Sequence, residues 1–113
     1  MFVRKWASRT ETTSFVPLPP DPPVYVSPLN ATGGQATTVA LAWKPGPWAH
    51  RADVYLSTSA TPALYRRDLS VSPNNTKKLT ISGLLPATTY YWRIVSKTMA
   101  GKSAAGPVWS FAT

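Results

Sequence analysis

Residues 89–97, with the sequence TYYWRIVSK, constrain the fold of this chain more than any other stretch. They are rich in β-branched and aromatic side chains, which favour strands. With a period of two residues, Tyr90, Trp92 and Ile94 fall on one apolar face of the strand, whereas Arg93 falls on the other. Because one face is apolar and the other is mixed, the pattern predicts a central strand with one side against a core.

The residues just before this strand predict how it is anchored. Pro86 rules out a continuing central strand, and the spacing Leu84-x-Pro86-Ala87-Thr88-x-Tyr90 is that of a tyrosine corner. In such a corner the tyrosine hydroxyl turns back onto the backbone a few residues upstream, which fixes a loop to a sandwich of two sheets.

These motifs resemble the fibronectin type III family. The resemblance rests on the corner, on Trp43 in the segment LAWKP, and on the closing segment GPVWSFAT, and it covers roughly residues 20–113. It implies an all-β fold, a seven-stranded antiparallel Greek-key sandwich of the immunoglobulin type, preceded here by an extended N-terminal arm. Members of this family act as spacers, adhesion surfaces, receptor ectodomains and accessory domains of secreted enzymes, so the resemblance indicates architecture more sharply than activity.

Alternating and turn-bounded segments place the seven strands and the core. The strands are expected at residues 24–29, 37–44, 52–56, 63–69, 77–81, 89–97 and 107–113. In the second of them Ala40 and Ala42 should face outward, and residues 98–106 should form a loop. The aromatic side chains expected in the core are Trp43, Tyr90, Trp92, Trp109 and Phe111.

Proline content divides the chain into three parts. Residues 17–23 hold five prolines in seven positions and predict a stiff linker, which separates a β arm at residues 1–16 from the domain at residues 24–113. Phe2, Trp6 and Phe15 make this arm a candidate assembly strand. It is either the last hairpin of a preceding module or a flexible leader.

Composition excludes several classes of function. The acids are Glu11, Asp21, Asp53 and Asp68, the single histidine is His50, and there is no cysteine. Because no nucleophile motif, phosphate loop or metal-ligand spacing accompanies them, we expect no catalysis, no cofactor and no metal site. Asp53 is expected to form a cross-strand ion pair with Arg93.

Charge and hydropathy limit the partners. The formal net charge of +8 comes from Lys and Arg residues spread along the chain, which favours general attraction to polyanions over specific nucleic-acid binding. No run of 18 apolar residues predicts membrane insertion, and the first residues lack the apolar centre of a signal peptide. If the protein is exported, its signal is expected outside this chain.

One group of surface residues is a candidate binding surface. Tyr55, Tyr91 and Arg93 are expected to point outward on adjacent strands, with Trp48 on a loop at one end of the same sheet. Aromatic platforms of this kind stack on sugar rings or anchor proteins, although exposed aromatic residues are also common simply as strand formers.

The function expected from these observations is a non-catalytic module of a larger secreted or cell-surface protein, acting as a spacer and as a protein or glycan contact domain. Its partners would then be neighbouring domains of the parent protein and a protein or polysaccharide. One alternative is a self-assembling filament subunit that donates residues 1–16 as a strand to a neighbouring copy. A second alternative is a carbohydrate-binding accessory module that uses Trp48, Tyr55 and Tyr91.

Overall fold

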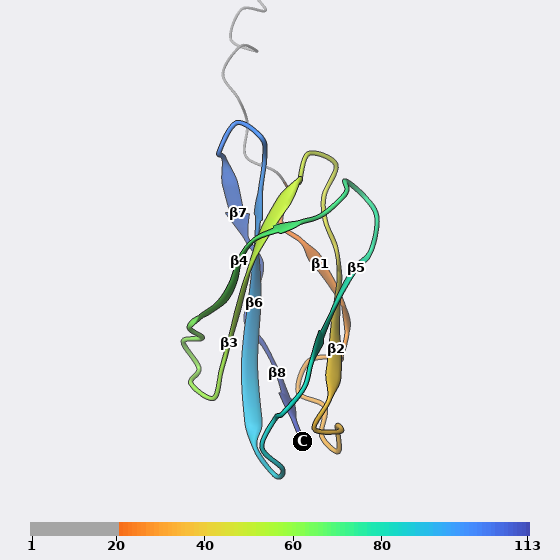
Figure 1. Ribbon diagram of the computed structural model, residues 1–113, viewed down its shortest axis with the longest axis vertical. Coiled ribbons are helices and arrows are strands. Elements are labelled where there is room, and N and C mark those ends of the chain that lie inside the picture. Colours follow the sequence, from red (N-terminus) through yellow and green to blue (C-terminus); the bar gives the residue numbers. More distant parts are fainter. Residues whose placement is uncertain (1–20) are drawn as a thin grey trace, which may run out of the picture.

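The computed structural model describes residues 21–113, which form two antiparallel β-sheets and no helix (Figure 1). The assembly arm with Phe2, Trp6 and Phe15, and residues 17–20 of the linker, lie outside the described residues. The strands are β1 (Val24–Ser27), β2 (Val39–Lys44), β3 (Arg51–Ser57), β4 (Leu64–Ser70), β5 (Lys77–Ile81), β6 (Thr89–Lys97), β7 (Ser103–Ala105) and β8 (Trp109–Ala112).

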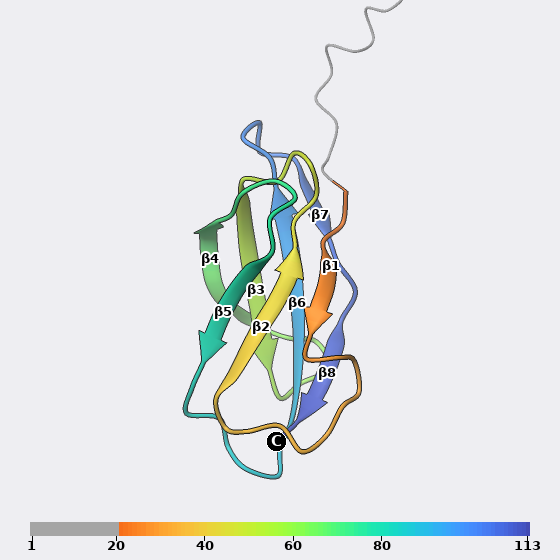
Figure 2. The same ribbon diagram turned by 90° about the vertical axis from the view of Figure 1, so that its right-hand side faces the viewer.

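The two sheets lie face to face, as Figure 2 shows with the smaller sheet in front. The smaller sheet has the order β1-β2-β5, and the larger has the order β4-β3-β6-β7, with β8 also paired to β6. All of these pairings are antiparallel. The prediction of an all-β chain that forms a sandwich is confirmed.

The described residues contain eight strands where the sequence predicted seven, because two short strands pair with β6 at the C-terminal end. β7 pairs with Val95 to Lys97 and β8 pairs with Thr89 to Trp92. Residues 106–108 separate them, and Pro107 among these has no N–H to give to the ladder. The sequence therefore indicated one strand and a loop where the chain forms two strands with a break.

The core lies between the sheets and is filled by the expected aromatic residues. Trp43 and Trp92 are fully buried, Phe111 and Tyr90 are buried, and Trp109 is half-buried against Tyr25 and Trp92 in edge-to-face contacts. Ala42 was expected to face outward and is instead 2% exposed, since its small side chain lies in the central strand between β1 and β5.

The tyrosine corner is formed as the spacing predicted. The hydroxyl of Tyr90 accepts a hydrogen bond from the N–H of Leu85 at 2.8 Å. The chain end is tied to the same corner, because the N–H of Thr113 donates to the carbonyl of Thr88 at 2.9 Å. The corner therefore fixes the start of β6 and the end of β8 together.

A second tyrosine bridges the two sheets at the break between β7 and β8. The hydroxyl of Tyr25, on β1, accepts a hydrogen bond from the N–H of Ile94 at 2.8 Å, in the stretch of β6 that neither β7 nor β8 covers. The ring of Tyr25 stacks on Trp92 with centroids 4.4 Å apart. The N–H of Gly106 donates to the carbonyl of Ile94, so both backbone groups of Ile94 are satisfied.

Candidate functional site

Three of the four predicted surface residues share the outer face of the larger sheet. Tyr55 on β3 lies directly opposite Arg93 on β6, and Ser57 lies opposite Tyr91. Residues opposite each other in an antiparallel pair project to the same side, and the diagonal neighbours are within reach of long side chains. Tyr55, Arg93 and Tyr91 therefore form one half-buried group on this face.

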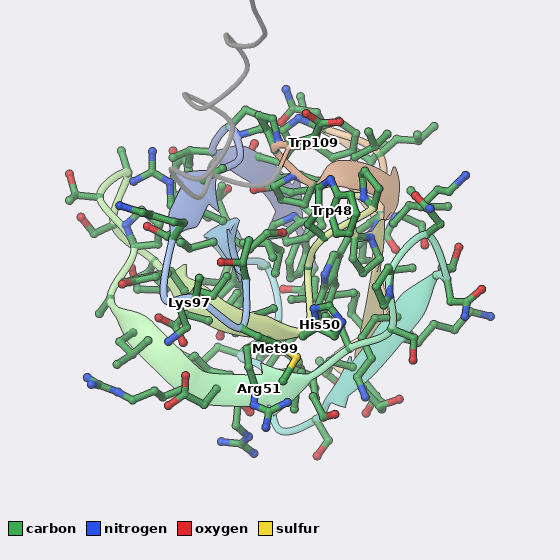
Figure 3. The ribbon with its side chains drawn as sticks, turned by 90° about the horizontal axis from the view of Figure 1, so that it is seen from above. Trp48, His50, Arg51, Lys97, Met99 and Trp109 are labelled. Atoms are coloured by element: carbon green, nitrogen blue, oxygen red, sulfur yellow. The ribbon has the colours of Figure 1, made fainter. Side chains whose placement is uncertain are left out.

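Trp48 lies apart from that group. It belongs to residues 45–50, the loop that leads into β3 at one end of the sandwich, where Figure 3 labels it near His50. Its side chain is 67% exposed, and its carbonyl contacts Nδ1 of His50 at 3.0 Å. Tyr55 is four residues further along β3 than Arg51, roughly 13 Å at about 3.3 Å per residue, so the structure does not bring Trp48 to the other three.

A hollow of about 380 Å³ lies over Tyr55 and Arg93 on the outer face. The β3–β4 loop forms one wall and the break between β7 and β8 forms another. The residues that line it are Tyr55, Ala60, Thr61, Pro62, Arg93, Val95 and Val108. The hollow thus combines a phenol ring, a guanidinium group and aliphatic walls. Tyr91 lies on the same strand as Arg93 but does not line the hollow.

Arg93 is oriented by the backbone of the strand break. Its Nε donates a hydrogen bond to the carbonyl of Gly106 at 3.2 Å, which leaves the two terminal nitrogens of the guanidinium for other partners. Among residues 21–113, no carboxylate lies within ion-pair distance of Arg93. An anion that entered the hollow would therefore meet a guanidinium already held in place.

The ion pair expected between Asp53 and Arg93 is wrong. Asp53 pairs instead with Lys97, with 3.2 Å between the carboxylate oxygen and Nζ, and Lys97 also pairs with Asp68. Asp53 lies opposite Val95, so both Arg93 and Lys97 are diagonal neighbours on β6, and sequence spacing alone does not choose between them. Lys97 is the partner of Asp53 in the structure, and Asp68 places a second carboxylate beside the same ammonium group.

Asp68 reaches that position through an irregularity in β4. The register of β3 with β4 shifts on either side of Val54, and Asp68 adopts a positive φ of 54°. Its N–H donates to the Asp53 carboxylate at 2.9 Å. The hydrogen bond from Lys97 lowers the pKa of Asp68, and the same bond raises the pKa of Lys97. Both acids on this face are thereby engaged outside the hollow.

Short side-chain hydrogen bonds hold the loop that forms the wall. The N–H of Ser59 donates to Oγ of Ser57 at 3.2 Å, and the N–H of Thr61 donates to Oγ of Ser59 at 3.2 Å. The N–H of Leu56 closes the loop on the carbonyl of Ala63 at 2.8 Å. These bonds satisfy the loop backbone locally, so Thr61 and Pro62 are held beside Tyr55.

Sequence reasoning identified Tyr55 and Arg93 and missed the rest of the hollow. Thr61 and Pro62 lie between two expected strands and received no role, and Val108 was expected in a continuous last strand. The one signal that could have found the break is Gly106 followed by Pro107, because proline cannot donate within a central ladder. The Gly106–Pro107 pair indicates a break in the strand, but it does not indicate that Val108 would line a hollow with the loop between β3 and β4.

The histidine and carboxylate side chains within residues 21–113 are His50, Asp21, Asp53 and Asp68. No cluster of three or more His, Asp or Glu side chains in this part of the chain could hold a metal ion. The part that the structure describes also has no helix long and apolar enough to cross a membrane. No family model, curated protein or solved structure matches the chain.

Proposed function

We propose that the chain is a non-catalytic, fibronectin type III-like module of a larger secreted or cell-surface protein, and that it serves as a spacer and as a contact domain. The tyrosine corner at Tyr90 and the buried Trp43 support the family assignment. The strand order supports it too, since β5 returns to pair with β2 after β3 and β4 in the other sheet, as Greek-key connections do. The extracellular location follows from the resemblance.

The hollow over Tyr55 and Arg93 is the observation that carries the contact role. It unites an aromatic ring, a positioned guanidinium and rigid apolar walls on one sheet face. Binding sites typically combine a concave apolar surface with a few oriented polar groups. The spacer role is supported by the layout of the sandwich, because β1 starts at one end and the C-terminus lies at the other (Figure 1).

Binding to a panel of polysaccharides and peptides tests the contact role. The full chain and the variant Tyr55→Ala are compared by affinity electrophoresis and by biolayer interferometry against neutral and charged members of the panel. We expect at least one member to retain the native chain, and Tyr55→Ala to weaken that binding by tenfold or more. Trp48→Ala is the matched control, because Trp48 is an exposed aromatic residue outside the hollow.

Two results would contradict the contact role. One is a native chain that no member of the panel retains. The other is a Tyr55→Ala variant that binds as the native chain does while Trp48→Ala loses binding, which would move the contact to the loop of residues 45–50. Far-ultraviolet circular dichroism of each variant establishes that the sandwich is intact before binding is compared.

The filament alternative depends on residues 1–16, which lie outside the described residues, so the described structure offers no observation in its favour. The carbohydrate-binding alternative shares Tyr55 with the hollow, whereas Tyr91 and Trp48 do not line it. We therefore treat it as a question about the ligand of this same surface.

A further inference from the structure

We propose that the hollow binds a carboxylated sugar ring, such as a uronic acid residue of an acidic polysaccharide. The carboxylate pairs with the guanidinium of Arg93, and the ring packs on Tyr55. This inference rests on the contact role proposed above and names the ligand class of that same surface. The residues that support it are Arg93 and Tyr55, together with the aliphatic side chains that line the hollow beside them.

The guanidinium selects for a carboxylate. Nε of Arg93 donates a hydrogen bond to the carbonyl of Gly106, and this contact restricts the orientation of the guanidinium group. The two terminal nitrogens can then form the paired hydrogen bonds that arginine makes with a carboxylate. Within the described residues the two acids nearest on this face, Asp53 and Asp68, are both bound to Lys97. The net charge of +8 adds attraction for any polyanion.

The remaining lining suits a ring that carries its polar groups at the rim. Tyr55 offers an aromatic ring, and Pro62, Val95 and Val108 offer aliphatic walls. Aromatic rings pack against the apolar C–H faces of such a ligand, while a hydroxyl such as that of Thr61 can bond the rim. A volume of about 380 Å³ is near the small end of ligand sites and suits one or two sugar rings.

An acidic peptide is disfavoured by the position of the hollow on a sheet face. Extended peptides gain much of their affinity by adding as a strand to a free sheet edge. Here β3 lies between β4 and β6, and β6 pairs with β3 on one side and with β7 and β8 on the other. In the gap between β7 and β8, the backbone N–H and carbonyl of Ile94 are bonded to Tyr25 and Gly106. The backbone offers a peptide no strand edge at this site, whereas the side chains offer a ring and a charge.

The test compares a charged oligosaccharide with its neutral counterpart. The probes are oligogalacturonate, oligomannuronate and a hyaluronan fragment, each of about six sugars, together with fully methyl-esterified oligogalacturonate. Binding to the full chain is measured by isothermal titration calorimetry at low and at physiological salt. We expect at least one uronate probe to bind, and for galacturonate we expect the ester to bind at least tenfold more weakly, since esterification removes the charge and keeps the ring.

Variants separate Arg93 from general charge. We expect Arg93→Gln to weaken binding of the preferred probe at least tenfold. Arg51→Gln makes the same change of charge on β3 at an exposed position outside the hollow, and we expect it to weaken binding less than twofold. Arg93→Lys keeps the charge without the paired geometry, and an intermediate loss is expected. Circular dichroism of each variant establishes that the fold is retained.

Each other outcome overturns the inference in a distinguishable way. Equal losses in Arg93→Gln and Arg51→Gln would mean diffuse attraction to polyanions. If oligogalacturonate and its methyl ester bind the native chain equally well, and Tyr55→Ala loses binding of both, the ligand is a neutral sugar. That result would overturn the uronate assignment and would leave the contact role standing. Tighter, Arg93-dependent binding of a poly-glutamate peptide would assign the carboxylate to a protein partner. No binding by any uronate probe would overturn the uronate assignment, and a native chain that also binds nothing in the wider panel would overturn the contact role.

Discussion

At the scale of single residues, Tyr25 and Gly106 depend on each other. The hydroxyl of Tyr25 reaches Ile94 by passing the backbone of Gly106, so closely that a Cβ on Gly106 would lie 2.5 Å from that hydroxyl oxygen and 2.9 Å from the ring. Position 106 requires glycine because the side chain of Tyr25, from the smaller sheet, leaves no room for a Cβ. The carbonyl of the same glycine also orients Arg93.

The variant Gly106→Ala should therefore destabilise the domain. Its methyl group must displace the Tyr25 ring or the strand break, and we expect the free energy of unfolding to fall by about 1–3 kcal/mol, as for other overpacked cores. Gly33→Ala is the matched control, because a Cβ at Gly33 meets nothing within 4 Å, and a change within about 0.5 kcal/mol is expected. Urea unfolding followed by tryptophan fluorescence measures both. Equal stabilities of the two variants would contradict this account of the contact.

At the scale of elements, the last strand is completed by a segment far from it in the sequence. After β1, the N–H of Ala31 donates to the carbonyl of Ser110 at 2.8 Å, and the N–H of Ala112 donates to the carbonyl of Thr32 at 2.8 Å. The side chain of Asn30 accepts from the N–H of Ser110 at 2.9 Å. β8 therefore has no free edge, which removes a site where a foreign strand could pair.

Asn30→Ala should loosen this cover while leaving the sandwich folded. The N–H of Ser110 loses its acceptor, and we expect a cost of about 1 kcal/mol, typical of one hydrogen bond at a partly exposed site. Amide hydrogen exchange followed by nuclear magnetic resonance should show faster exchange at Ser110. At Ile94, whose N–H is bonded to Tyr25, exchange should rise by no more than the roughly fivefold that a loss of about 1 kcal/mol in global stability allows. Unchanged exchange at Ser110 would mean that another group replaces the asparagine.

The elements also show what the sequence could predict. β5 and β6 have the bounds that alternation indicated, because each has strong strand formers between clear turns. The pairing of residues 30–35 with β8 could not be foreseen, since it joins residues about 80 positions apart and leaves no periodic signal. For the site, alternation placed Tyr55 and Arg93 on one face, but the partner of Asp53 depended on a positive φ at Asp68, which no sequence pattern specified.

At the scale of the whole molecule, the buried hydroxyl of Tyr25 is a polar link between the two sheets. Burial raises the pKa of Tyr25 from 10.0 to about 12, although the hydrogen bond from Ile94 and the nearby charge of Arg93 act in the opposite direction. The neutral phenol is thus the form compatible with a closed sandwich. Stability at alkaline pH is tied to the contact between the sheets.

We expect the free energy of unfolding to fall between pH 10 and about pH 12. Below pH 10 Tyr25 is neutral in both states and adds no pH dependence. Above it the unfolded chain loses the proton while the folded chain keeps it up to about pH 12, so stability falls by up to about 3 kcal/mol. Urea unfolding at several pH values measures this fall in the native chain and in Tyr25→Phe.

The variant Tyr25→Phe is less stable at neutral pH, because the N–H of Ile94 loses its acceptor, and its stability should fall less steeply over the same pH range. Loss of the Lys97 ion pairs at high pH affects both chains alike, so the difference between their slopes reports Tyr25. Parallel slopes in the two chains would show that Tyr25 is not the group responsible.

The opposed ends of the sandwich have a mechanical consequence. β1 starts toward one end, and the C-terminus lies at the other end (Figure 2), where Thr113 is bonded to Thr88 of the tyrosine corner. A pull applied between residue 21 and the C-terminus would run along the strands, so that the hydrogen bonds of β1 to β2 and of β8 to β6 are loaded in shear and several must break together. Such a sandwich is expected to resist stretching until β1 or β8 slides past its neighbouring strand, and then to yield in one step.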